Sequence, residues 1–197
     1  MTDLLIVLAA YLLGSIPFAL VTSRLFRLAD PRSYGSGNPG ATNVLRSGNK
    51  AAAALTLFGD ALKGWFAVWL AMRFGASDWI LAAAGLAVFL GHLYPIFIGF
   101  KGGKGVATAL GVLVGFSPLV AFGCAACWVL TARLSGYSSA AAIAAAVAAP
   151  PLTIWSTGNR DLAVAALAMT ILLVWRHRTN IARLLRGEES RIGGKRG

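Results

Sequence analysis

Three short segments of the sequence place glycines beside basic and hydrogen-bonding residues. The first reads GSGNPGATN over residues 35–43, and Arg46 follows it. Glycines let backbone N–H groups converge on an anion, and an arginine can bind a phosphate through two parallel hydrogen bonds. The spacing also fits the G-x-G-x-x-G pattern of dinucleotide sites, but an apolar segment precedes it and no βαβ unit fits around it. We therefore expect a phosphate site, with a plain tight loop as the alternative. The site would use Ser36, Gly37, Asn38, Thr42 and Asn43.

The second segment reads GHLYPIFIGFKGGKGVAT over residues 91–108. It is not an ATP-binding P-loop, because Ile98 and Gly105 stand where that motif requires Gly and Ser or Thr. Its glycines and lysines lead into a short apolar helix that starts at Val106, and a helix N-terminus attracts anions. The segment predicts a second anion site, with a cationic membrane anchor as the alternative. The residues concerned are Lys101, Gly102, Gly103 and Lys104.

The third segment reads RHRTNIARLLRGEE over residues 176–189. His177, Asn180 and Arg183 are spaced three apart, so they share one face if the preceding helix continues past Trp175. We expect that face to lie on the same side of the membrane as the two glycine-rich segments. The alternative is an interfacial basic helix that binds acidic lipid.

Two further pairs of residues lie inside apolar stretches. Asp60 and Lys63 stand at i and i+3, and each charge costs about 2.5–3.5 kcal/mol at a membrane helix centre, so they indicate a polar interior. We assign them a supporting role as an ion pair, with direct catalysis as the alternative. Cys124 and Cys127 are expected to be packing residues, because no cation or second cysteine pair accompanies them. No metal site is predicted.

The elements that must position these segments are membrane helices. The chain has 57% hydrophobic and 13% charged residues and a mean hydropathy of +0.71, which excludes an ordinary soluble globule. Its 197 residues suit one polytopic domain, residues 1–197. Eighteen Lys and Arg against seven Asp and Glu give a net charge of +11, which favours anionic partners. These are lipid headgroups or phosphorylated metabolites rather than nucleic acid, since little surface remains outside the membrane.

Charge placement decides the number and orientation of the helices. The fourth apolar stretch is interrupted by a Gly/Ser/Pro cluster at residues 115–118, which predicts a tight turn. Gly14 with Pro17 late in the first stretch, and Gly91 with Pro95 late in the third, predict kinks. Splitting it gives seven transmembrane helices, and only then do the basic first loop and the basic C-terminal tail both lie in the cytoplasm, with the N-terminus outside. The resulting helix after KGGKG has ten residues, about 15 Å, so a polar cavity must bridge the remaining depth. The apolar stretches are Leu4–Ser23, Ala51–Met72, Trp79–Ile98, Val106–Ala132, Ser139–Trp155 and Leu162–Trp175.

Taken together and in this order, the three segments resemble the signature segments of the bacterial acyl-phosphate-dependent glycerol-3-phosphate acyltransferases. The resemblance implies a seven-helix all-α enzyme of the bacterial plasma membrane whose active site faces the cytoplasm. It implies transfer of a fatty acyl group from acyl phosphate to the 1-hydroxyl of glycerol 3-phosphate, which gives 1-acyl-glycerol 3-phosphate and phosphate and begins phospholipid synthesis. No ATP, coenzyme A or other cofactor is implied. Besides the substrates, the implied partners are membrane lipid and the enzyme that makes acyl phosphate.

The resemblance also assigns roles to residues of the three segments. It implies that Arg46, Lys104, His177 and Asn180 are catalytic, and that Ser36 and Thr42 bind substrate. The proton acceptor stays open between His177 and a substrate phosphate oxygen. An anion transporter is the competing interpretation, but no inverted repeat is visible in the sequence. A structural scaffold would not need three basic segments on one side of the membrane.

Overall fold

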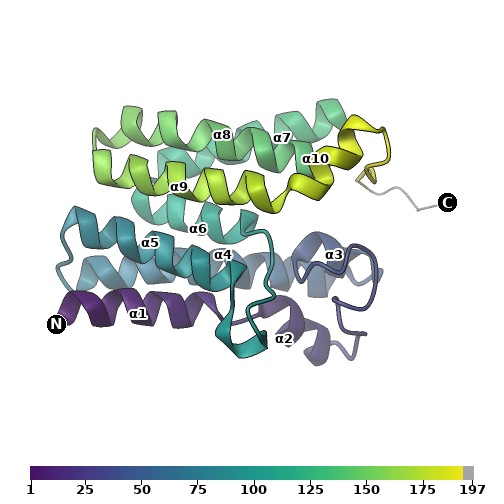
Figure 1. Ribbon diagram of the computed structural model, residues 1–197, viewed down its shortest axis with the longest axis horizontal. Helices are drawn as coiled ribbons and strands as arrows, with labels where there is room; N and C mark the ends of the chain where they lie inside the picture. Colours follow the sequence, from purple (N-terminus) through teal and green to yellow (C-terminus); the bar gives the residue numbers. More distant parts are fainter. Residues whose placement is uncertain (193–197) are drawn as a thin grey trace.

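The computed structural model describes residues 1–192, which form ten α-helices and one short 3-10 helix and contain no strand. The all-helical architecture predicted from the sequence is therefore confirmed for these residues. Most of the helices run along the long axis of the molecule (Figure 1). The helices are α1 (Thr2–Gly14), α2 (Phe18–Leu25), α3 (Ala41–Leu45), α4 (Lys50–Arg73), α5 (Asp78–Leu93), η1 (Ile96–Ile98), α6 (Val106–Phe116), α7 (Pro118–Ser135), α8 (Ser138–Thr157), α9 (Arg160–Arg176) and α10 (Arg178–Leu185).

The helices pack in two groups. The first group consists of α1, α4, α5 and α6, in which α4 packs against α6 and α1 against α5. The second group consists of α7, α8 and α9, with α8 between the other two. Contacts of α5 with α9 and of α6 with α7 join the groups, and Figure 1 shows α6 lying between them. Any site that uses residues of both groups therefore depends on how they are held together.

Glycines allow the closest helix contacts in the first group. A Cβ atom on Gly111 of α6 would lie 1.9 Å from the carbonyl oxygen of Ala61 on α4, and one on Gly14 of α1 would lie 2.1 Å from that of Val88 on α5. Small residues of this kind let helix backbones approach closely in membranes, where van der Waals contact drives association. The first group is accordingly a tightly packed frame.

The lengths of the helices match a membrane protein. Four stretches are long and apolar enough to cross a membrane, namely Lys50–Arg73, Asp78–Ile98, Pro118–Ser135 and Ser138–Thr157. Two bent pairs pass the same test together: α1 with α2, bent by 41°, and α9 with α10, bent by 56°. The remaining apolar helix, α6, has 11 residues. Seven membrane segments stay a prediction that this arrangement accommodates.

Two breaks between helices lie at positions that the sequence predicts. α6 ends at Phe116 and α7 starts at Pro118, so the predicted turn in the fourth apolar stretch is confirmed. Pro118 suits the first helical position, where its missing N–H costs nothing. The kink predicted from Pro17 is also found, between the end of α1 and the start of α2. The break at His177, between α9 and α10, is not marked by glycine or proline.

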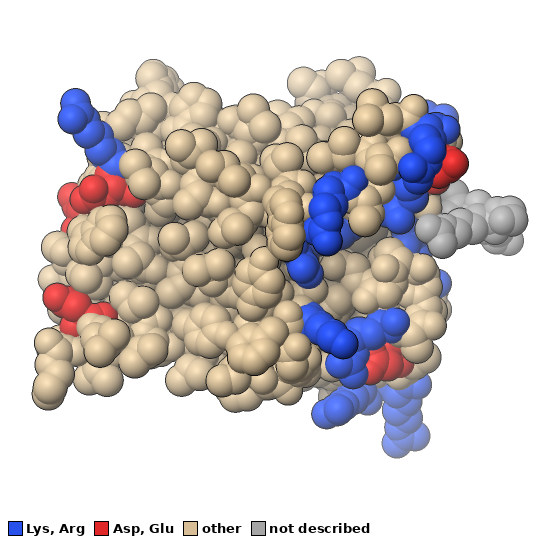
Figure 2. Space-filling view, in the orientation of Figure 1, with Lys and Arg blue, Asp and Glu red and all other residues tan. Residues whose placement is uncertain are grey.

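Basic side chains gather at one end of the molecule. Figure 2 shows most of the visible Lys and Arg at the end where α2, α3 and α10 lie, and little basic surface at the opposite end. Almost no charged side chain is visible on the surface between the two ends, as expected of a surface that faces lipid. Many large apolar side chains are exposed there, among them Phe58, Phe122 and Leu130.

Candidate active site

A cavity of about 340 Å³ lies between the two helix groups. Its volume is in the range of small-molecule sites. One part of its wall is polar and comes from all three glycine-rich or basic segments, which are distant in sequence. The polar lining residues from these segments are Ser36, Asn38, Thr42, Asn43, Arg46, Lys104, His177, Asn180, Arg183, Glu189 and Ser190. Asp60, His92, Ser138, Ser139 and Thr170 from the helices also line the cavity.

Asn43 holds the first loop together. Its buried amide oxygen accepts hydrogen bonds from the Ser36 N–H (3.0 Å), the Ser36 hydroxyl (3.2 Å) and the Arg46 Nη1 (3.4 Å). Its Nδ2 donates to the carbonyl oxygens of Pro31 (2.6 Å) and Tyr34 (3.2 Å). Because Asn43 uses both ends of its amide on the protein, its place in the site is to position Ser36 and Arg46.

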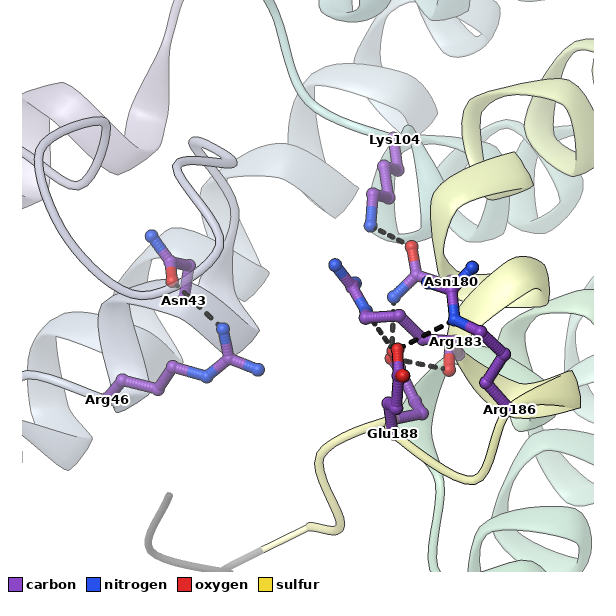
Figure 3. Close-up of polar contacts among 9 residues, drawn as sticks. Asn43, Arg46, Lys104, Asn180, Arg183, Arg186 and Glu188 are labelled. Atoms are coloured by element: carbon purple, nitrogen blue, oxygen red, sulfur yellow. Dashed lines mark hydrogen bonds and ion pairs between the residues drawn. The ribbon is translucent and has the colours of Figure 1, made fainter. Parts of the chain in front are cut away.

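Arg46 faces the cations of the other segments across the cavity. Figure 3 shows Asn43 and Arg46 on the side of α3, and Lys104, Asn180 and Arg183 on the opposite side. All five residues line the same cavity. Two positively charged walls of this kind suit an anion between them.

Glu189 orders the side of the site that belongs to α10. It accepts hydrogen bonds from Ser139 Oγ (2.9 Å), Asn180 Nδ2 (2.6 Å) and Arg183 Nε (2.7 Å). The hydrogen bond from Asn180 Nδ2 to Glu189 orients the Asn180 Oδ1 toward Lys104. The Lys104 Nζ donates a hydrogen bond to this oxygen. Burial alone would raise the pKa of Glu189, but the hydrogen bonds from Arg183, Asn180 and Ser139 outweigh burial and lower this pKa. The sequence reasoning assigned no role to Glu189; its only signal was an acidic pair inside a basic segment.

Lys104 is the most perturbed cation among the groups outside the helices. Burial, followed by repulsion from Arg183 and from the more weakly acting Arg176 and Arg46, lowers its pKa to about 8, although Glu189 opposes the shift. Lys104 is therefore charged at neutral pH but close to its titration range. A bound phosphate would favour the ammonium form.

His177 stands at the bend between α9 and α10. The sequence prediction that His177, Asn180 and Arg183 share a face depended on a continuous helix, and this condition is not met, since α9 ends at Arg176 and α10 turns away by 56°. All three residues nevertheless line the cavity. The His177 Nδ1 lies 2.8 Å from the carbonyl oxygen of Leu173, which can accept only from a protonated nitrogen. In the neutral ring Nε2 then carries the lone pair.

Three predicted glycine donors lie outside the cavity lining. The N–H groups of Gly102 and Gly103 donate to the carbonyl oxygens of Leu93 and His92, both at 3.2 Å, and that of Gly37 donates to Tyr34 at 3.0 Å. Backbone carbonyl oxygens already accept from these N–H groups, and the phosphate-binding role of the three glycines stays a prediction. Lys101 is exposed and does not line the cavity either.

The predicted Asp60–Lys63 pair forms and includes a third member. Lys63 Nζ lies 2.7 Å from Asp60 Oδ1 and donates to the carbonyl oxygen of Ile16 at 2.8 Å, in the break between α1 and α2. His92 Nδ1 lies 3.3 Å from the same Asp60 oxygen. All three side chains are buried. The network joins α4, α5 and the broken first helix pair, which supports the predicted structural role; the sequence reasoning did not include His92.

The rest of the cavity wall is mostly apolar and is lined by residues of α6, α7, α8 and α9. Small residues of α8 leave space there, and the inner end lies at Leu113, Cys124, Ala149 and Ala166. These four pack with Val120 and Ala121 in one buried cluster. The apolar residues nearer the polar end are Val106, Ala109 and Leu110 of α6, Ala125, Trp128 and Val129 of α7, Ala142, Ala145 and Ala146 of α8, and Met169 and Leu173 of α9.

Comparison with known proteins agrees with this arrangement. The family model described as Glycerol-3-phosphate acyltransferase matches residues 4–187. A protein of Burkholderia pseudomallei (strain K96243) named glycerol-3-phosphate acyltransferase is 59% identical over 199 residues, which cover 100% of this chain and 98% of that protein. A protein of the same name from Burkholderia multivorans (strain ATCC 17616 / 249) is 58% identical over 198 residues, covering 100% and 93%.

Two solved structures have the same fold. They are crystal structures of PlsY (YgiH), an integral membrane glycerol 3-phosphate acyltransferase, in its glycerol 3-phosphate form and in its lysophosphatidic acid form. The first has a TM-score of 0.93 and 43% sequence identity, and the second 0.91 and 42%; both cover 98% of this chain and 96% of the other. A match of this extent in sequence and structure leads to one conclusion: the chain belongs to the glycerol-3-phosphate acyltransferase family.

Proposed function

We propose that this acyltransferase moves a fatty acyl group from acyl phosphate to the 1-hydroxyl of glycerol 3-phosphate, which forms 1-acyl-glycerol 3-phosphate and inorganic phosphate. The observation that carries the proposal is one cavity that combines a cationic wall with a mostly apolar wall, which packs into a buried apolar cluster. Acyl phosphate has the same division into an anionic head and an apolar chain. The acceptor adds a second phosphate, which suits the two facing groups of cations around Arg46 and Lys104.

The reaction needs positioning more than activation. Acyl phosphate is a mixed anhydride, so the bond from its acyl carbon to the phosphate oxygen is already reactive. The 1-hydroxyl oxygen attacks the acyl carbon, the new ester bond forms, and phosphate leaves with the electron pair of the broken bond. Arg46, Lys104 and Arg183 offset the repulsion between the two phosphates and stabilise charge on the leaving group.

The proton of the attacking hydroxyl goes to the leaving phosphate. In the neutral ring the Nε2 of His177 is an acceptor, so it can hold the hydroxyl in place by a hydrogen bond. The phosphate released in the same step has an oxygen that can take the proton. His177 therefore acts chiefly in binding, and Asn180, fixed by Glu189, holds Lys104 beside it.

The active site faces the cytoplasm of a bacterial plasma membrane. This follows if the seven predicted segments cross the membrane and the basic end lies inside, as the positive-inside rule requires. The same basic surface suits anionic lipid headgroups and is the side from which a soluble enzyme that makes acyl phosphate would deliver it. A phosphate transporter is not favoured, because the cavity beyond the three basic segments is lined mostly by apolar side chains, which offer an anion few partners.

The proposal is tested with purified protein in lipid nanodiscs, labelled glycerol 3-phosphate and one of two donors, palmitoyl phosphate or palmitoyl-coenzyme A. We expect labelled lysophosphatidic acid from palmitoyl phosphate alone, with release of one inorganic phosphate per product. Lys104→Ala protein serves as the control for contaminating activity. Product from palmitoyl-coenzyme A but not from palmitoyl phosphate would disprove the donor while leaving the family assignment intact.

A further inference from the structure

Arg176, the last residue of α9, binds the glycine pair that precedes Lys104. Its Nη2 donates to the carbonyl oxygens of Gly102 (2.7 Å) and Gly103 (3.0 Å), and its Nε donates to that of Gly103 (3.2 Å). The guanidinium also lies over the ring of Tyr94, 5.8 Å from its centroid. Neither the sequence reasoning nor the resemblance gives this arginine a role.

The same glycine pair is held from its other side by the end of α5. As described above, both N–H groups donate to carbonyl oxygens of α5 residues, so all four polar backbone groups of Gly102 and Gly103 are engaged. A Cβ atom on Gly102 would lie 2.0 Å from the carbonyl oxygen of His92, and one on Gly103 would lie 2.3 Å from the His92 Nε2. The backbone can approach α5 this closely only because both residues are glycine.

The contact joins the two helix groups at the active site. Gly102 and Gly103 are fixed to α5 of the first group, whereas Arg176 ends α9 of the second group. Lys104 comes directly after the glycine pair, His177 comes directly after Arg176, and Asn180 follows three residues later. The distance between the two sets of active-site residues is therefore set where Arg176 crosses between the groups.

We propose that Arg176 is a positioning residue for the acyl transfer: it fixes Lys104 relative to His177 and Asn180. Its planar guanidinium reaches two successive carbonyl oxygens at once, which a lysine ammonium on a flexible stem does not reproduce. It also engages the two carbonyls that would otherwise present negative dipoles near the phosphates. The inference rests on the glycerol-3-phosphate acyltransferase activity and adds a residue that does not line the cavity.

A double-mutant cycle tests the inference. We expect Arg176→Lys to lower kcat/KM by about 10-fold, equivalent to about 1.4 kcal/mol, and Arg176→Gln to lower it further. In protein that already carries Lys104→Ala, we expect Arg176→Lys to cause less than about a 2-fold further loss, because an effect exerted through Lys104 disappears with Lys104. Arg178→Lys is the matched control, because Arg178 is exposed and its guanidinium lies over the ring of Trp175. We expect the kcat/KM of this variant to match that of the wild type.

Two results would overturn the inference. The first is an equal loss in the presence and absence of Lys104, since this would make Arg176 independent of it. The second is wild-type activity of Arg176→Lys. Thermal unfolding and gel filtration of each variant separate loss of fold from loss of positioning. If Arg176→Gln does not fold, the activity of Arg176→Lys still tests the inference, because lysine keeps a long side chain and the positive charge. Wild-type protein without activity would instead refute the proposed function.

Discussion

Arg46 and Lys104 approach the cavity from opposite sides, so each is expected to contribute its own charge-assisted contact to a phosphate. Loss of such a contact costs about 1.5–3 kcal/mol, and we therefore expect Arg46→Ala and Lys104→Ala each to lower kcat/KM by about 10–150-fold without unfolding the protein. Lys101→Ala is the matched control, because that side chain is exposed and outside the cavity lining. Near-wild-type turnover in both cavity variants would exclude a shared phosphate site.

The pKa of Lys104, lowered to about 8, gives a pH dependence with a defined sign. Below pH 8 the free enzyme carries the ammonium form that binds phosphate, and above it this form is lost. We expect kcat/KM to be level just below that pH and to fall about 10-fold per pH unit well above it, as measured between about pH 6 and 10. An arginine stays charged over this pH range, so the kcat/KM of Lys104→Arg, where it is measurable, should not fall above pH 8. If kcat/KM of that variant still falls above pH 8, another group causes the pH dependence.

His177 is expected to act mainly in binding. His177→Gln retains a hydrogen-bonding group, so we expect it to raise KM for glycerol 3-phosphate and to keep kcat within about 10-fold of the wild type; His177→Ala should be worse in KM. Removal of a general base typically lowers kcat by about 10²–10⁴-fold. Unchanged substrate binding with kcat reduced by more than about 10³-fold in His177→Gln would identify His177 as the base.

At the scale of the helices, the apolar interior of the cavity is expected to select the acyl chain. Cys124 lines this apolar part and packs in the buried cluster that includes Val120 and Ala121. An overpacked contact costs about 1–3 kcal/mol, so Cys124→Phe should lower the rate with octadecanoyl phosphate more than with dodecanoyl phosphate. The measurement is the ratio of the two rates, with Cys127→Phe, outside the cavity lining, as the control. An equal loss for every chain length would argue against a binding site that ends at Cys124.

The sequence predicted those elements whose signals are local. The turn before Pro118, the kink at Pro17 and the Asp60–Lys63 pair each follow from residues close in the chain, and all three are found. The convergence of the three segments could be expected because each is rich in cations and hydrogen-bonding groups. The bend at His177 could not, because neither glycine nor proline marks it.

The roles of the glycines were not predictable for a related reason. A Gly-rich segment that binds an anion and one that packs against a helix have the same composition. Here the segment packs against a helix, because its backbone is held by carbonyl oxygens of α5 and by Arg176, a residue 73 positions from Gly103. The position of Glu189 likewise depends on Ser139, 50 positions away. Contacts of this range leave no local pattern in a single sequence.

At the scale of the whole molecule, the uneven distribution of charge predicts its orientation. Arg160 starts α9 and Arg186 follows α10, so exposed residues near opposite ends of the molecule are available for labelling. In a background with Cys124→Ala and Cys127→Ala, we expect an impermeant maleimide added to intact cells to label Arg160→Cys but not Arg186→Cys. Labelling of Arg186→Cys alone would reverse the proposed topology.

The cavity has its cationic residues among the three basic segments and its apolar lining along α6, α7, α8 and α9. A chain bound in it lies with its tail pointing inward and its headgroup at the basic surface. The new lysolipid is thus formed in the orientation it takes in the cytoplasmic leaflet and needs no reorientation to enter it. All membrane area produced by this reaction is then added to one leaflet, so balanced growth of the bilayer requires a separate step that moves lipid across it.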